Sequence, residues 1–114
     1  MTANELTQAI LTVLNCTSGC FAWRQNNHAT RGRRNNVKQA VTDIMGCYNG
    51  NFLGIEVKVG SDRMSDKQIA FKDSVIKAGG IHFEAKTLDS FLEFWKKQTG
   101  RPMPPGQQQE TPNI

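Results

Sequence analysis

The sequence contains no apolar run that approaches the roughly 20 residues that a transmembrane helix needs, so we expect no membrane partner. Its first ten residues include an acid and no basic residue, which argues against a signal peptide. Three cysteines are an odd number and predict no disulfide framework, as is typical of a reducing, cytoplasmic compartment. The sequence has 114 residues, of which 38% are hydrophobic and 21% are charged. This composition is typical of one folded domain.

Acidic residues are absent between Glu5 and Asp43. The same stretch contains five basic residues: Arg24, Arg31, Arg33, Arg34 and Lys38. From Asp43 onward nine acidic and nine basic residues cancel, so the excess behind the net charge of +4 arises in this one segment. Two interpretations are open. The segment is either a solvated loop or an arm that binds the phosphates of a nucleic acid.

Hydrophobic periodicity predicts an α/β domain. Apolar residues at helical spacing predict a helix over 3–15, and residues 20–24 have the pattern of a short strand. A polar basic loop follows, and residues 37–41 suit the start of another strand. Further along we expect a helix over 65–78 that ends at two glycines, a strand over 81–86 and a helix over 88–98. This order predicts a small mixed sheet flanked by helices over residues 1–99, followed by a disordered tail over 100–114.

The centre of the sequence predicts a β-hairpin. Asn49-Gly50 separates two strand-like segments, and this dipeptide favours a type I′ turn, which requires positive φ at both central residues. If these two residues form the loop, Asp43 lies directly opposite Glu56, with Cβ atoms about 4.5–5.5 Å apart. Lys58 then lies on the same face, one step further along the strand.

Two carboxylates that face each other repel, so a protein avoids the arrangement unless something neutralises them. Oxygen ligands that converge on one point suit Mg²⁺, which takes one or two carboxylates and completes its shell with water and phosphate oxygens. Lys58 beside them suits an ammonium that orients an attacking water. The alternative is a solvated strand face on which Lys58 partners an acid by chance, and a bulge in the hairpin would shift the register by one residue.

The string DIMGCYNGNFLGIEVK over 43–58 resembles the core of the PD-(D/E)xK nuclease superfamily, and more narrowly that of the VRR-NUC family. The resemblance covers residues 3–98. It includes the stretch WRQNN over 23–27 and the stretch MSDKQ over 64–68, which is followed by a helix, Gly79-Gly80 and a strand. One departure is Thr42, which stands where the superfamily often has proline.

The resemblance implies a restriction-endonuclease-like α/β fold and a metal-dependent DNA endonuclease of phage or bacterial origin. It implies Mg²⁺ or Mn²⁺ as the cofactor. The implied site consists of Asp43 and Glu56 as metal carboxylates, the Val57 backbone carbonyl as a further ligand, Lys58 as the catalytic lysine, Gln68 from the following helix and Glu5 from the first helix. The implied substrate is branched DNA such as a four-way junction, cut by a homodimer to leave 5′ phosphates. Arg24 and the four basic residues after it are the expected DNA contacts.

Several residues have two interpretations in the sequence. Gln68 is either the capping partner of Ser65 or a group that reaches the site, and the two roles compete for one side chain. Trp23 is either a core residue or a DNA contact. A zinc site from Cys16, Cys20 and His28 fits the usual ligand spacings poorly. Cys47 is expected to pack against its neighbours.

Other aromatic and histidine residues have simpler interpretations. His82 is expected on a strand surface, whereas Phe91 and Trp95 are expected in the core. The apolar bulk of the last helix, from Phe91 to Trp95, suggests that this helix and the first one form the dimer surface.

Two other functional classes compete with the nuclease. One is a catalytically silent nucleic-acid-binding module with the same fold. The other is an inhibitor or scaffold protein that uses the basic segment against an acidic partner.

Overall fold

A computed structural model describes residues 1–25 and 42–100 of the chain. Its elements in chain order are α1 (Ala3–Asn15), β1 (Cys20–Arg24), β2 (Ile44–Tyr48), β3 (Asn51–Val57), α2 (Asp66–Lys77), β4 (Ile81–Ala85) and α3 (Leu88–Thr99). The helices and strands expected at these positions are confirmed. The expected strand start at 37–41 and the tail beyond residue 100 lie outside the described residues. None of the three helices is long and apolar enough to cross a membrane.

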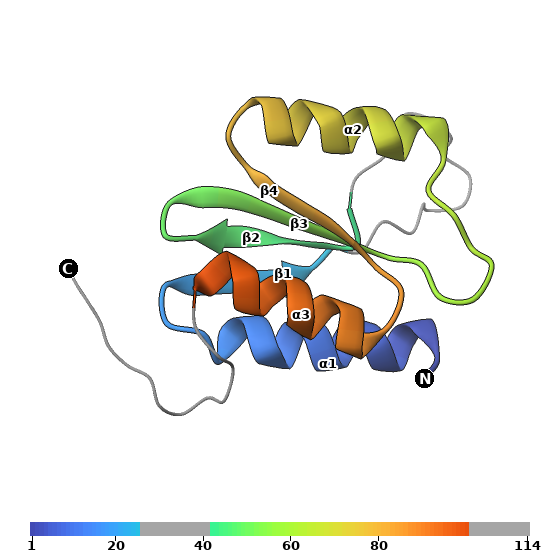
Figure 1. The fold of residues 1–114 in the computed structure, drawn as a ribbon, viewed down its shortest axis with the longest axis horizontal. Coiled ribbons are helices and arrows are strands. Elements are labelled where there is room, and N and C mark those ends of the chain that lie inside the picture. Colours follow the sequence, from blue (N-terminus) through green and yellow to red (C-terminus); the bar gives the residue numbers. More distant parts are fainter. Residues whose placement is uncertain (26–41, 101–114) are drawn as a thin grey trace.

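The four strands form one mixed sheet in the order β1-β2-β3-β4. The first three strands are antiparallel neighbours, whereas β3 and β4 run parallel and are joined by a crossover through α2. Helices α1 and α3 lie on one face of the sheet and α2 lies on the other (Figure 1). The expected α/β class with a small mixed sheet flanked by helices is therefore confirmed.

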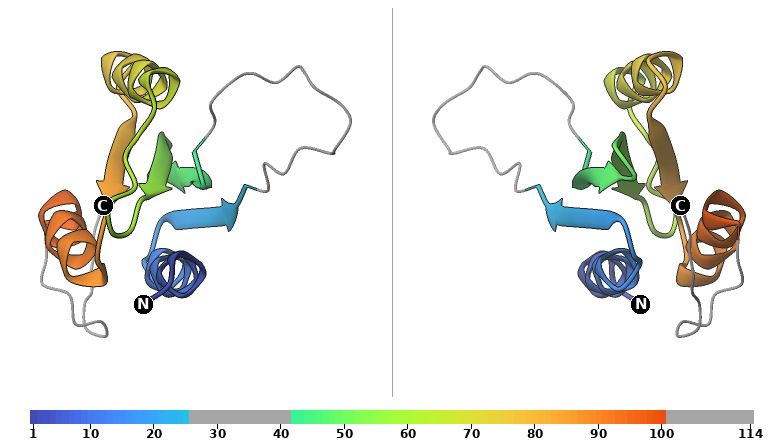
Figure 2. Two further views of the ribbon diagram at one scale, coloured as in Figure 1. Left: turned by 90° about the vertical axis from the view of Figure 1, so that its right-hand side faces the viewer. Right: turned by 90° about the vertical axis from the view of Figure 1, so that its left-hand side faces the viewer.

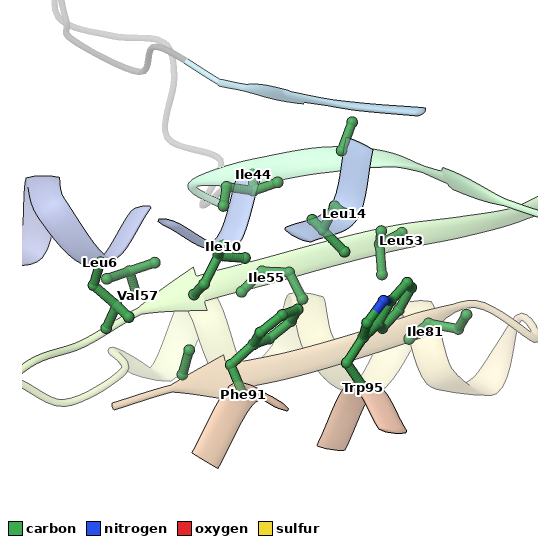
Figure 3. Packing of buried hydrophobic residues seen from close by; sticks show 12 residues of the cluster. Leu6, Ile10, Leu14, Ile44, Leu53, Ile55, Val57, Ile81, Phe91 and Trp95 are labelled. Carbon is green, nitrogen blue, oxygen red and sulfur yellow. The ribbon is translucent and has the colours of Figure 1, made fainter. Parts of the chain in front are cut away.

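The hydrophobic core lies between the sheet and the α1–α3 layer (Figure 3). Leu6, Ile10 and Leu14 are buried because they recur along one face of α1. They meet Phe91 and Trp95 of α3, which are both fully buried as expected. The indole N–H of Trp95 donates to the Thr17 hydroxyl at 3.0 Å, so this buried ring has no unpaired donor.

The aromatic residues of α3 pack against other residues of the same chain. Phe94 stacks on Phe83 of β4 with ring centroids 4.2 Å apart, and Tyr48 packs on Trp95 at 5.0 Å. Because Phe91 and Trp95 are also fully buried, little of this apolar bulk is left for a second copy of the chain. The sequence-based reason for placing a dimer contact on this helix is therefore wrong.

The opposite face of the sheet is only partly covered. Helix α2 lies over β3 and β4 and leaves the β1–β2 half uncovered by any described helix (Figure 2). Phe21 is 65% exposed and Trp23 is 44% exposed on that half. The core interpretation of Trp23 is wrong. Strand alternation directs Ala22, which lies between Phe21 and Trp23, towards the core and directs the two aromatic side chains away from it. Cys47, expected to pack, is exposed as well.

The outer edge of β1 is closed by a side chain. The Asn15 carboxamide donates from Nδ2 to the Ala22 carbonyl and accepts the Ala22 N–H at Oδ1, both at 2.9 Å. This pair of bonds imitates a neighbouring strand. A free strand edge is a template for pairing with another chain, and Asn15 occupies the middle of this one.

Replacement of Asn15 by alanine removes both of these bonds. We expect the free energy of unfolding of Asn15→Ala to fall by about 1 kcal/mol, since water replaces the lost partners only in part. Urea unfolding followed by circular dichroism measures the difference. Gln8→Ala, at an exposed position on the same helix, serves as the control. Equal stability of the two variants would show that the Asn15 carboxamide contributes nothing to the fold.

Candidate active site

The β2–β3 hairpin has the register that the sequence predicts. Asn49 and Gly50 have φ values of 50° and 87°, so both central turn residues are left-handed, as in a type I′ turn. Tyr48 pairs with Asn51, and the ladder continues without a bulge to Ile44 opposite Ile55. One further step brings Asp43 opposite Glu56. The Asp43 Oδ2 atom accepts the backbone N–H of Val57 at 2.8 Å, which fixes this carboxylate at the end of β3.

Glu56 is a fully buried carboxyl group. Its Oε1 atom accepts a hydrogen bond from Gln68 Nε2 at 3.3 Å, whereas Oε2 has no partner. The pKa of Glu56 is raised to about 8, chiefly by burial and next by the nearby charge of Asp43, whereas Lys58 acts in the opposite direction. Without a cation, this carboxyl group therefore holds a proton at neutral pH.

The backbone at the end of β3 alternates between its two neighbours. The Lys58 N–H donates to the Ala85 carbonyl of β4 at 2.9 Å, whereas the Val57 N–H points the other way, to Asp43. The carbonyl of a strand residue points to the same side as its N–H. The Val57 carbonyl therefore faces the side on which Asp43 lies, as its expected role in metal binding requires.

Gln68 performs both of the roles that seemed to compete. The Gln68 Oε1 atom accepts the Ser65 backbone N–H at 2.9 Å, and the Gln68 backbone N–H donates to the Ser65 hydroxyl at 3.1 Å. These two bonds complete a capping box for α2. Its Nε2 donates to Glu56. The expectation that one role excludes the other is wrong, because a carboxamide has a donor end and an acceptor end.

Glu84 is a neighbour of the site that the sequence did not indicate. It pairs with Glu56 in the parallel β3–β4 ladder and is half-buried. Its charge adds to the rise in the Glu56 pKa. No signal in the sequence predicts this contact, since the two strands are joined by a long crossover whose length does not set their register.

His82 on β4 is buried, which contradicts its expected place on a strand surface. It pairs with Gly54, where an added Cβ would lie only 3.2 Å from the imidazole Cδ2. Neither ring nitrogen has a hydrogen-bond partner. Burial lowers the pKa of His82 to about 4, with the charge of Lys72 as a smaller cause, so the ring is neutral at pH 7.

Two residues expected at the site are engaged elsewhere. Glu5 lies on α1, on the other face of the sheet from Glu56, and its Oε1 atom accepts the Thr2 N–H at 2.9 Å in a capping box. Arg24 is exposed at the end of β1 and donates to the Asn4 side chain at 2.6 Å. The remaining expected DNA contacts, Arg31, Arg33, Arg34 and Lys38, lie outside the described residues.

The donor set fits a hard divalent cation. Asp43, Glu56 and the Val57 carbonyl supply oxygen atoms only, and the Glu56 Oε2 atom is buried without a partner. Over residues 1–25 and 42–100 no three His, Cys, Asp or Glu side chains converge as a metal site. A pair of carboxylates is nevertheless sufficient for Mg²⁺, which keeps several of its waters.

The structure does not favour the zinc alternative. Cys16 and Cys20 are free thiols, and His28 lies outside the described residues. Burial raises the pKa of the Cys20 thiol to about 11, with Cys47 as a smaller cause, so it is protonated at neutral pH. Among the described residues, no further His, Cys, Asp or Glu joins Cys16 and Cys20 in a metal-binding group.

No family model matches this sequence, and no curated protein matches it at a meaningful level of similarity. The function must therefore be inferred from the residues and their geometry.

The raised pKa of Glu56 predicts a pH dependence of stability in the absence of metal. At neutral pH the folded protein binds a proton on Glu56 that the unfolded chain has lost, so stability falls as pH rises towards 8. His82 has the opposite slope, but that slope fades above pH 6.5 and contributes little between pH 7 and 8. Between pH 7 and 8 we expect a loss of about 1 kcal/mol.

Urea unfolding in EDTA at the two pH values measures this loss. Glu56→Gln should show almost none of it, whereas Glu93→Gln, an exposed change on α3, should behave like the parent protein. A parental slope in Glu56→Gln would contradict the assignment of this titration to Glu56.

Proposed function

We propose that this protein is a metal-dependent endonuclease that hydrolyses DNA phosphodiester bonds and has a restriction-endonuclease-like fold of the VRR-NUC type. The main observation is Glu56, a fully buried carboxyl group with one unpartnered oxygen, opposite Asp43. Burial of such a group beside a second acid is costly for a purely structural protein, because each carboxylate disfavours ionisation of the other. A divalent cation offsets this cost, and the neighbouring Lys58 and Gln68 complete the set that the sequence resemblance implies.

Each residue has a defined part in the proposed reaction. Asp43, Glu56 and the Val57 carbonyl hold Mg²⁺ or Mn²⁺, which when bound neutralises charge on the scissile phosphate and makes water a better nucleophile. The Gln68 amide holds the Glu56 carboxylate in one orientation. The Lys58 ammonium orients the attacking water and stabilises the charge that builds up in the transition state. Attack in line with the leaving 3′ oxygen leaves a 5′ phosphate.

The partners follow from the same proposal. The substrate is DNA, with branched forms such as four-way junctions preferred, and the basic residues between Arg24 and Lys38 contact its phosphates. Coordinated cutting of two strands requires two active sites, which a two-fold homodimer provides. We place the protein in the cytoplasm of a phage-infected or bacterial cell, where this substrate is found. A silent DNA-binding module is the weaker candidate, because DNA binding alone requires no buried carboxyl group opposite a second acid.

Cleavage assays with isosteric variants test the metal carboxylates. Asp43→Asn and Glu56→Gln should each lower the cleavage rate by about 100-fold or more, since each loses a charged oxygen ligand while its shape is kept. The substrates are supercoiled plasmid and a labelled four-way junction with Mg²⁺ or Mn²⁺, and EDTA provides the blank. Glu93→Gln should cut at the parental rate. Parental rates in either site variant would overturn the proposed site.

Lys58 is tested by separating binding from chemistry. Lys58→Ala should lower the single-turnover rate by about 100-fold or more, because its charge acts in the transition state. Its affinity for DNA, measured by titration in Ca²⁺, should change by less than about threefold. Lys96→Ala, on the exposed surface of α3, is the matched control. If affinity falls in parallel with rate, Lys58 binds DNA and does not act in the chemical step.

A further inference from the structure

Two aromatic side chains lie exposed on the same face of the sheet as the candidate site. Phe21 and Trp23 of β1 have ring centroids 5.6 Å apart, with their planes at 46°. Phe21 pairs with Cys47 and Trp23 pairs with Met45, and directly opposed residues of antiparallel strands share a face. Met45 is two residues from Asp43, so Trp23 lies on the neighbouring strand and about 7 Å along the strand direction from Asp43. Glu56 lies one strand further, on β3.

Nothing among residues 1–25 and 42–100 accounts for this exposure. Every other aromatic side chain among the described residues is buried or half-buried. The remaining exposed large apolar residues, Met1, Ile69 and Ile76, lie at the N-terminus and on α2. A paired, exposed aromatic surface beside a polar site is typical of a binding surface.

The sequence that follows the aromatic pair indicates what binds there. The chain between β1 and β2 contains four basic residues, Arg31, Arg33, Arg34 and Lys38, and no acid. A partner must therefore combine negative charge with flat apolar groups. An unpaired stretch of nucleic acid has both properties, because its phosphates are anionic and its exposed bases stack on aromatic rings. Fully paired DNA meets only the first requirement, since its bases are already stacked.

We propose that Phe21 and Trp23 form a stacking platform for unpaired nucleobases. The role of this platform in substrate choice rests on the proposed nuclease function. The platform selects DNA that has single-stranded bases next to the bond to be cut, such as flaps, gaps and opened junctions. Bases stacked on Trp23 hold the neighbouring phosphate near Asp43 and Glu56.

Binding titrations test the platform without any cleavage. The probes are a labelled 15-nucleotide oligo-dT and a 15-base-pair duplex, each titrated in Ca²⁺ and followed by fluorescence anisotropy. Trp23→Ala and Phe21→Ala should each weaken oligo-dT binding between about 5-fold and about 150-fold, the range found for base stacking on aromatic side chains. Duplex binding should change by less than about threefold.

Matched variants show whether the loss of oligo-dT affinity is due to the aromatic ring itself. Trp23→Phe keeps an aromatic ring and should restore most of the affinity for oligo-dT, whereas Trp23→Leu should not. Ile76→Ala removes a comparably exposed apolar group from α2 and should leave both affinities unchanged. Circular dichroism and thermal unfolding establish that each variant is folded.

Several results would overturn the platform. One is parental oligo-dT binding by folded Trp23→Ala and Phe21→Ala. Another is a change in oligomeric mass on light scattering without any change in oligo-dT affinity, which would assign this face to a second copy of the chain. Parental preference for flap over duplex in cleavage by Trp23→Ala would also overturn it. By contrast, Trp23-dependent oligo-dT binding without cleavage in Mg²⁺ or Mn²⁺ would support the platform and overturn the nuclease proposal.

Discussion

The candidate site depends on the register of the β2–β3 hairpin. Two turn residues with positive φ set this register, and the ladder transmits it without a bulge from Tyr48 to Ile44. A slip of one residue would turn Glu56 to the other face of the sheet, into the layer of α1 and α3. The acid pair, the Gln68 contact and the orientation of the Val57 carbonyl would all be lost together.

The two faces of the sheet differ in how completely they are packed. One face carries the core, in which α1 and α3 bury their apolar stripes (Figure 3). The other face is covered by α2 only over β3 and β4 (Figure 2). Glu56 lies on the covered half and Phe21 and Trp23 on the open half, so the acid pair stands between a helix and an accessible surface. This position shields the Glu56 carboxyl group from water, whereas the neighbouring Asp43 remains half-exposed.

Gln68 connects the stability of α2 to the geometry of the site. The same carboxamide closes the N-terminal cap of the helix and binds the buried Glu56. Because capping fixes the side-chain conformation, the Nε2 donor is already oriented towards the carboxylate. Glu56 in turn gives α2 a polar anchor on the sheet, which matters because no side chain of this helix is fully buried.

The sequence by itself determined the helices, the strands and the opposition of Asp43 and Glu56, because periodicity, caps and a two-residue turn act between residues close in the chain. Tertiary structure decided the placement of Glu84 beside Glu56, the burial of His82 and the exposure of Trp23. The first two depend on the parallel β3–β4 register, which forms across a long crossover and has no local signal. The exposure of Trp23 depends on which half of the sheet α2 covers, and that is fixed by the packing of the whole chain.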